Sequence, residues 1–304
     1  MEWEDEAEAP QDPLAAQYPE WFLEAIDDQP ERGSVEVAGT AIETLSWGRS
    51  GEAPLLLLHG NGSHADWWCP LAPMLANDRR VAALSWSGMG RSGWRDSYTM
   101  ELYERELIEG AAALGLFDGD RKPWIVAHSF ATWPALHVAA SSEGERFAGL
   151  IVVDNGARVP RPQWQPEAAP PEPRRGYESL IEGVSRFRLR PPQPCANTFL
   201  LEYIAMRSLV ERDDGRWHWC FDPELDAKRD GIFGRDLGPV MAAARIPLAF
   251  LWGALSSLMG PEVDDRTRAF APAGTRFVEM PEAAHHLMLD QPIAFVTAVK
   301  ALVA

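Results

Sequence analysis

The chain has 304 residues, of which 46% are hydrophobic and 24% are charged, and its formal net charge is −17. This length allows one large α/β domain with an insertion, and the composition is that of an ordinary globular protein. The acidic balance argues against nucleic acid and anionic membranes as partners, because both require a basic footprint. We therefore expect neither partner, and the net charge itself indicates solubility rather than a function.

The three cysteines, Cys69, Cys195 and Cys220, show no CxxC motif and no Cys/His spacing typical of a metal site. We expect reduced thiols, no structural disulfide and no bound metal. No apolar run approaches the roughly 18 residues of a membrane helix. Four of the first six residues are acidic, unlike a secretory leader, so the sequence predicts a soluble, cytoplasmic protein.

Strands and helices alternate in the first half of the chain, after an acidic start that we expect to be loose. Residues 34–38 and 41–47 predict a hairpin around Gly39-Thr40. Short apolar runs typical of strands buried in a parallel sheet lie at residues 55–58, 81–85, 124–127 and 149–153. Helical patterns lie at residues 19–28, 66–75, 97–114 and 131–140.

Residues 155–240 interrupt this alternation with a proline-rich start. Helical patterns at 177–187 and 198–212 and an aromatic strand at 217–219 follow. The alternation then resumes with the predicted helices 237–244, 264–270 and 293–303 and the predicted strands 247–253 and 275–280. The order predicts an α/β fold with a mostly parallel, doubly wound sheet and an inserted, mainly helical cap. Residues 1–154 and 241–304 are expected to form the core, and residues 155–240 the cap.

One serine stands where an apolar strand meets a helix. The run Trp124–Ala127 leads into Ser129, and the small residues Ala127 and Ala131 allow the tight turn of a nucleophile elbow. The backbone N–H of Phe130 is then available to a developing oxyanion. A buried serine that only opens a helix has the same local pattern, so the wider context must decide.

Four features then follow in the order of the α/β-hydrolase fold superfamily. They are His59-Gly60 after a strand, the glycine loop 88–92, the serine turn 127–131 and the segment 283–292, which contains His285 and His286. The chain resembles the capped, serine-nucleophile members of this superfamily. The resemblance implies that Ser129 is the nucleophile and His285 the base. His286 is the alternative candidate for the base. It also implies an oxyanion hole made by the N–H groups of Asn61 and Phe130.

The acid of the family's triad is missing from its usual place. It normally follows the strand after the cap, and Ser256 occupies that position here. Asp154, at the end of the strand before the cap, is the best substitute, although Asp is also common at such turns. Glu262, Asp264 and Asp265 remain alternatives, and so does a weakened serine–histidine pair without an acid.

The cap is expected to set specificity. Candidates for lining the substrate pocket are Trp86, Trp164, Trp217 and His286. Seven arginines between Arg158 and Arg190 either attract an anionic substrate or pair with nearby glutamates.

Together these features predict a serine hydrolase that cleaves a small-molecule ester, lactone or thioester without a cofactor. The alternatives are a non-hydrolytic binding protein, a carbon–carbon bond hydrolase and a cofactor-free haloperoxidase-like enzyme. Neither the substrate nor the oligomeric state follows from the sequence.

Overall fold

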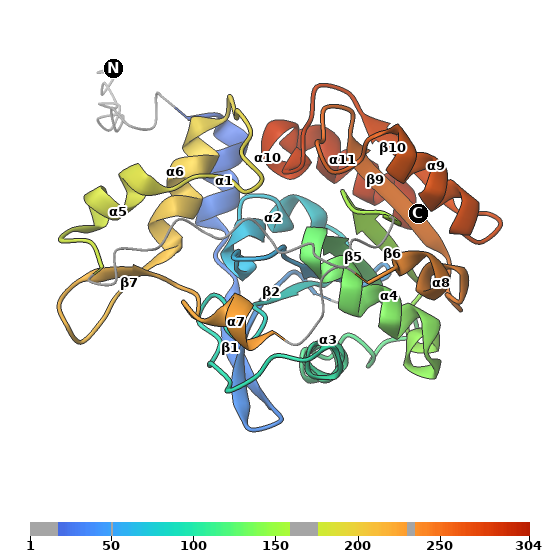
Figure 1. Cartoon of the computed structure of the whole chain (residues 1–304), viewed down its shortest axis with the longest axis horizontal. Coiled ribbons are helices and arrows are strands. Elements are labelled where there is room, and N and C mark those ends of the chain that lie inside the picture. Colours follow the sequence, from blue (N-terminus) through green and yellow to red (C-terminus); the bar gives the residue numbers. More distant parts are fainter. Residues whose placement is uncertain (1–17, 50, 159–175, 230–234) are drawn as a thin grey trace, which may run out of the picture.

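The computed structural model describes residues 18–49, 51–158, 176–229 and 235–304 (Figure 1). Its main sheet contains β1 (Glu31–Val37), β2 (Thr40–Trp47), β3 (Leu55–Leu58), β4 (Val81–Leu84), β5 (Trp124–His128), β6 (Gly149–Val153), β9 (Leu248–Gly253) and β10 (Arg276–Met280). These eight described strands lie in the order β1-β2-β4-β3-β5-β6-β9-β10. Strands β4, β3, β5, β6, β9 and β10 are parallel, whereas β1 and β2 are antiparallel. The predicted α/β fold and mostly parallel sheet are confirmed.

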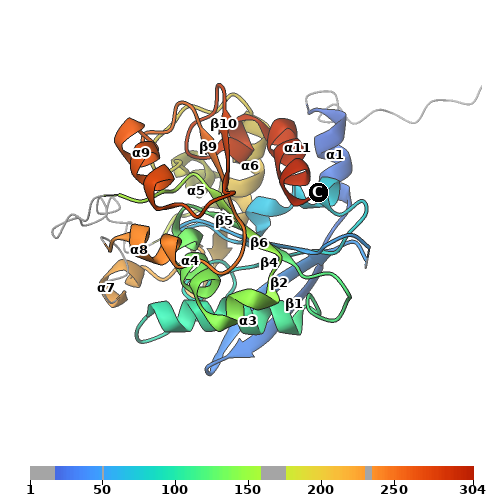
Figure 2. The same cartoon turned by 90° about the vertical axis from the view of Figure 1, so that its right-hand side faces the viewer.

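Both faces of the sheet are buried, which explains why its strands are unbroken apolar runs. Successive side chains of a strand point to opposite faces. Leu55 and Leu57 of β3 join one hydrophobic cluster, and Leu56 and Leu58 join the other. Helices α1 (Glu20–Asp27), α2 (Ala72–Leu75) and α11 (Pro292–Val303) contribute to the first cluster, and α3 (Met100–Ala113) and α4 (Thr132–Ala140) to the second. Figure 2 shows α1 and α11 on one side of the sheet and α3 and α4 on the other.

The insertion, which we define as residues 155–240, lies between β6 and β9. Its described elements are α5 (Leu180–Arg186), α6 (Thr198–Arg207), β7 (Leu209–Glu211), β8 (Trp217–Trp219), α7 (Leu225–Lys228) and the start of α8 (Leu237–Ala242). Strands β7 and β8 pair as an antiparallel ribbon. Helix α6 lies beside α1 (Figure 1), where the rings of Phe22 and Phe199 are 4.8 Å apart. Helix α8 packs on α4 and on α9 (Pro261–Phe270), so the boundary between core and cap stays a prediction.

A buried carboxylate ties the insertion to the core. Asp66 lies in the short helix η2 (Ala65–Trp68) and accepts a hydrogen bond from Arg32 Nη2 at 2.5 Å. Its carboxylate also lies 3.6 Å from His64 Nδ1 and 3.7 Å from Arg207 Nε of α6. Burial alone raises the pKa of Asp66, but the hydrogen bonds from His64 and Arg32 outweigh it and hold that pKa well below its ordinary value.

Several predicted boundaries are wrong for local reasons. The helix predicted at 66–75 is two short helices, because Pro70 lies between them and has no N–H to donate. Helix α3 begins at Met100 rather than 97, since the Thr99 side chain caps it by accepting the N–H of Leu102. The helix predicted at 198–212 ends at Arg207, and the chain continues into β7.

All three cysteines are free thiols, as the sequence predicts. No helix in the described part of the chain is long and apolar enough to cross a membrane.

Candidate active site

The predicted site residues meet at the carboxyl edge of the parallel strands. Asn61 follows β3, Ser129 follows β5, Asp154 follows β6 and His285 follows β10. Because β3, β5, β6, β9 and β10 are parallel and adjacent in this order, their carboxyl ends lie along one edge. Ligands of open α/β sheets bind at this edge.

Ser129 lies on a strained turn. Its φ is +53°, a region that residues other than glycine seldom adopt. The side chain of Asn155 holds this turn by donating Nδ2–H to the Ser129 carbonyl at 2.9 Å. A Cβ atom on Gly60 would lie only 3.2 Å from Cβ of Ser129, so the loop after β3 approaches the serine as closely as a glycine allows. The turn has the form of a nucleophile elbow.

A chain of short hydrogen bonds connects Ser129 to a buried carboxylate. His285 Nε2 lies 2.9 Å from Ser129 Oγ, and His285 Nδ1 lies 2.6 Å from Asp154 Oδ2. The carboxylate accepts, so Nδ1 carries the proton and Nε2 presents its lone pair to the serine hydroxyl. His285 and Asp154 are 2% and 1% exposed, so little water competes for these bonds.

Both carboxylate oxygens of Asp154 accept hydrogen bonds from the end of β9 and the loop that follows it. Oδ1 accepts the N–H of Gly253 at 3.0 Å, and Oδ2 accepts the hydroxyl of Ser256 at 2.6 Å. The residue that occupies the family's usual acid position therefore donates to the carboxylate. Of the alternative acids, Asp264 pairs with Arg268 on α9. The structure brings Asp154 to His285.

His128 and His286 pack against His285. Their ring centroids lie 4.8 Å from that of His285 in each case, and 5.4 Å from each other. His128 donates Nε2–H to the His285 carbonyl at 3.1 Å, which helps to hold the histidine loop. Burial lowers the pKa of both His128 and His286 well below the ordinary value, and the neighbouring His285 lowers it further.

The insertion contributes one wall of the site. The Arg190 carbonyl accepts His286 Nε2–H at 3.0 Å, and Gln193 Oε1 accepts the His286 N–H at 2.8 Å. Gln193 also donates to Asp290, which accepts the N–H of Ala284 and so closes the histidine loop. These bonds tie the segment 190–194 to His285.

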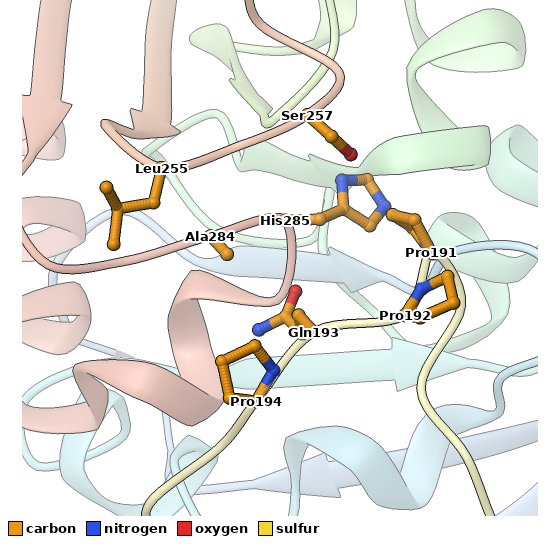
Figure 3. A pocket seen from close by; sticks show the side chains of 8 residues that line it. All are labelled: Pro191, Pro192, Gln193, Pro194, Leu255, Ser257, Ala284 and His285. Carbon is orange, nitrogen blue, oxygen red and sulfur yellow. The ribbon is translucent and has the colours of Figure 1, made fainter.

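A small pocket opens between this segment and the histidine. Its volume is about 160 Å³, and Figure 3 shows His285 at its centre, between the proline-rich segment and the loop that follows β9. The lining residues are Pro191, Pro192, Gln193, Pro194, Leu255, Ser257, Ala284 and His285. Drug-sized ligands occupy about 300–1,000 Å³, so this space accommodates only a small group.

Arg229 was missed by the sequence analysis, because nothing in its sequence neighbourhood connects it with the loop after β3. It follows α7, and its Nη1 donates to Asn61 Oδ1 at 2.5 Å. Its guanidinium lies over the ring of Phe130, 4.4 Å from the centroid. A buried cation thus contacts both residues that the resemblance assigns to the oxyanion hole.

The tryptophans predicted at the pocket lie elsewhere or outside the described residues. Trp86 has no exposed surface; it donates Nε1–H to the His59 carbonyl and packs edge-on against Phe130. Trp86 thus packs against Phe130, a predicted site residue, and does not line the pocket. Trp217 lies in β8, opposite Glu211, and exchanges backbone hydrogen bonds with Tyr177. Trp164 lies outside the described residues.

The basic region between residues 158 and 190 is described only at its two ends. Arg158 donates to the Leu258 carbonyl, and Arg188 donates to the carbonyls of Ser185 and Phe187. Glu178, one of the predicted partners, pairs with Arg216.

Comparisons with known proteins agree with this architecture. Residues 55–299 match the model of the alpha/beta hydrolase family. The pimeloyl-[acyl-carrier protein] methyl ester esterase of Edwardsiella ictaluri is 25% identical over 253 residues, which cover 82% of this chain and 92% of the esterase. Lipase LipV of Mycobacterium tuberculosis is 33% identical over 118 residues, or 37% of this chain and 43% of the lipase.

Solved structures show the same fold. The thioesterase domain from the curacin biosynthetic pathway has a TM-score of 0.72 and 20% identity, with 90% of this chain and 99% of that domain covered. Because the family model matches most of the sequence and the eight described strands have the matching arrangement, the chain belongs to the alpha/beta hydrolase family.

Proposed function

We propose that this protein is a serine hydrolase that cleaves a carboxyl ester, thioester or lactone through an acyl-enzyme. The observation that carries the proposal is the continuous hydrogen-bonded chain Ser129–His285–Asp154. A serine hydroxyl is a poor nucleophile at neutral pH and needs a base within hydrogen-bond reach. The base needs an acid that sets its tautomer and stabilises the imidazolium.

In the first half of the reaction, His285 Nε2 accepts the proton of the Ser129 hydroxyl while Oγ attacks the substrate carbonyl carbon. The imidazolium then gives this proton to the leaving alcohol or thiol. Asp154 stays ionised throughout and stabilises the imidazolium through the Nδ1–H bond of 2.6 Å.

The negative charge that develops on the substrate oxygen needs donors on the opposite side of the serine. We assign this role to the N–H groups of Asn61 and Phe130, and to the nearby guanidinium of Arg229 a supporting electrostatic role. In the second half of the reaction, His285 deprotonates a water molecule, which attacks the acyl carbon of the acyl-enzyme. The bond to Ser129 Oγ then breaks, the acid is released, and the imidazolium returns the proton to Oγ.

The nature of the site and the relatives support this substrate class. The named relatives are a methyl ester esterase, a lipase and a thioesterase domain. The pocket beside His285 is small, and three prolines, Leu255 and Ala284 are among its lining residues, which favours a short apolar group on one side of the scissile bond. The insertion acts as the cap in this proposal, because segment 190–194 and Arg229 reach the site from it. The three free thiols support the expected cytoplasmic location, which is part of the same proposal.

A non-hydrolytic binding protein is the alternative, motivated by Ser256 at the usual acid position and by the alanines Ala127 and Ala131 in the elbow. The 2.6 Å contact of Asp154 with His285 Nδ1 supports the hydrolase over this alternative.

The test is covalent labelling with a fluorophosphonate, followed by mass spectrometry of the labelled peptide. We expect one adduct, on Ser129, and turnover of activated short-chain esters that Ser129→Ala abolishes. Ser141→Ala, which removes a hydroxyl that only donates to the Val138 carbonyl, is the matched control and should retain full activity. A folded protein that neither reacts at Ser129 nor hydrolyses any activated ester would contradict the proposal.

A further inference from the structure

Three histidine side chains gather beside the nucleophile, more than the proposed reaction uses. One ring nitrogen from each of His128, His285 and His286 lies within 4.8 Å of one from each of the others. All three rings are buried, with exposures of 1%, 2% and 3%. We propose that these rings form a binding site for a divalent transition-metal ion such as Zn²⁺. We also propose that the bound ion silences Ser129, which means that it prevents the serine from reacting. The metal site stands on its own geometry, whereas the silencing rests on the proposed function.

Each ring already makes a hydrogen bond from one of its two nitrogens, as metal-binding histidines do from the nitrogen that does not bind the metal. Such a histidine donates its second N–H to a carboxylate or a backbone carbonyl, which orients the ring and leaves the other nitrogen as the ligand. His285 donates Nδ1–H to Asp154, His286 donates Nε2–H to the Arg190 carbonyl, and His128 donates Nε2–H to the His285 carbonyl. Carbonyl and carboxylate oxygens only accept, so the tautomers follow from these bonds. The lone pairs therefore lie on His285 Nε2, His286 Nδ1 and His128 Nδ1.

The lone pair of His286 provides a second, independent observation. Its Nδ1 is buried and has no hydrogen-bond partner. A buried polar atom without a partner is destabilising and rare in native proteins. The ring donates to the Arg190 carbonyl on its other side and packs against Trp67, with 5.3 Å between the centroids, so these contacts orient the ring. A metal ion satisfies this atom.

The distances allow coordination after a modest adjustment. Zn–N bonds of about 2.0–2.1 Å at tetrahedral angles place the nitrogens about 3.3 Å apart. One nitrogen from each histidine lies within 4.8 Å of the others, so the ligand atoms must approach one another by up to about 1.5 Å. Imidazole ligands suit Zn²⁺, Cu²⁺ and Ni²⁺ rather than Mg²⁺ or Ca²⁺, which prefer oxygen.

Coordination at His285 removes the base from the proposed reaction. The lone pair on Nε2 is the one that accepts the Ser129 proton, and it cannot serve the metal and the serine at once. Asp154 strengthens the competing bond, because a carboxylate on the opposite nitrogen makes the histidine a better ligand. The ion thus inhibits reversibly, and a chelator restores the active arrangement.

Isothermal titration of chelator-treated protein with Zn²⁺ tests the site directly. We expect one ion per chain. His286→Phe keeps an aromatic ring beside Trp67 and removes the lone pair, so it should weaken Zn²⁺ binding at least tenfold. His137→Gln is the matched control, because His137 lies on α4 and pairs with Glu104 away from the site; it should bind Zn²⁺ as the wild type does. If circular dichroism shows that His286→Phe is unfolded, His286→Gln takes its place.

Fluorophosphonate labelling with and without Zn²⁺ tests the silencing. We expect that stoichiometric Zn²⁺ blocks labelling of Ser129 and that EDTA restores it. The metal site is refuted if no ion binds, or if the folded His286 variant binds Zn²⁺ as tightly as the wild type. Silencing is refuted if Zn²⁺ binds with the expected stoichiometry and labelling is unchanged. Metal-free protein that does not react with the probe contradicts the proposed function instead, and the calorimetric result remains interpretable.

Discussion

Replacement of Asp154 by asparagine tests the arrangement of the site most sharply, because the two side chains have nearly the same shape. The Gly253 N–H faces Oδ1 at 3.0 Å and always donates, so it selects the amide oxygen of the new side chain. The amide nitrogen then occupies the place of Oδ2 and points its hydrogens toward His285 Nδ1. Two donors cannot face each other, so the ring must move its proton to Nε2. In this tautomer His285 has no lone pair for Ser129.

The expected loss of activity follows from this change of tautomer. The same substitution in a serine protease triad, which is a worked case of the general argument and not a measurement on this protein, lowers kcat by about 10⁴. Ser256 is the additional feature here, because its hydroxyl also donates to Oδ2 and can turn to accept from the new amide. We therefore expect a loss of about 10³–10⁴ in kcat/KM, or about 4–5 kcal/mol of transition-state stabilisation.

The assay is hydrolysis of an activated short-chain ester, with Asp264→Asn and Glu262→Gln as matched controls on α9. Both controls should retain activity within about twofold of the wild type. The reasoning is refuted if Asp154→Asn keeps more than about a tenth of the activity, or if one of the α9 variants loses it instead.

A second carboxylate offers a complementary test. The double variant Asp154→Asn/Ser256→Asp places an acid at the position where the family usually has it, and should recover at least tenfold over Asp154→Asn alone. The pair Asp154→Asn/Ser256→Asn has the same shape without the charge and should recover nothing.

Two further predictions concern a cation and a buried anion. Arg229→Met removes the guanidinium that binds Asn61. It should lower kcat/KM by about 10–100-fold, because a charge that stabilises the oxyanion is lost. Fluorophosphonate should still label the serine, because the serine–histidine pair remains. Asp66→Asn should lower the free energy of unfolding at pH 7 by about 2 kcal/mol, since the pKa of Asp66 is held well below its ordinary value by His64 and Arg32. The folded pKa is depressed, so this stability is present above about pH 4 and is lost as the pH falls further. Urea titrations at several pH values should therefore show the wild type and the variant converging in acid.

Each of these two predictions has a control. Arg207→Met removes a cation that stacks on Tyr203, 3.6 Å from the ring centroid, and should leave kcat/KM unchanged. Arg229→Met with unchanged kcat/KM would show that the cation has no electrostatic role. Asp120→Asn removes an exposed carboxylate and should not alter the stability at pH 7. A constant difference between the Asp66 variant and the wild type at every pH would contradict the assigned ion pairs.

The sequence was sufficient for the fold class because its signals are local and repeated. Runs such as Leu55–Leu58 are apolar at every position, and only a strand covered on both faces hides such a run from water. The turn at Ser129 was recognisable for a related reason, since small residues on either side are what a tight strand-to-helix turn requires. His285 followed from the resemblance of the segment 283–292 to the histidine loop of the family.

The sequence singled out Asp154 as the best substitute acid, but its contact with His285 and the other surroundings of that ring come from the tertiary structure. Asp154 follows β6 and Ser256 follows β9, and these two strands pair side by side. Asp154 reaches His285, and Ser256 reaches Asp154. The sequence does not contain the register that joins Val153 to Leu251. The hydrogen bond from Ser256 to Asp154, the contact of Arg229 with Asn61 and the unpartnered nitrogen of His286 all join residues far apart in the chain. A local pattern determines which residues form a strand or a turn, but only packing determines which side chains from different strands are in contact. The chemistry of this site depends on those contacts.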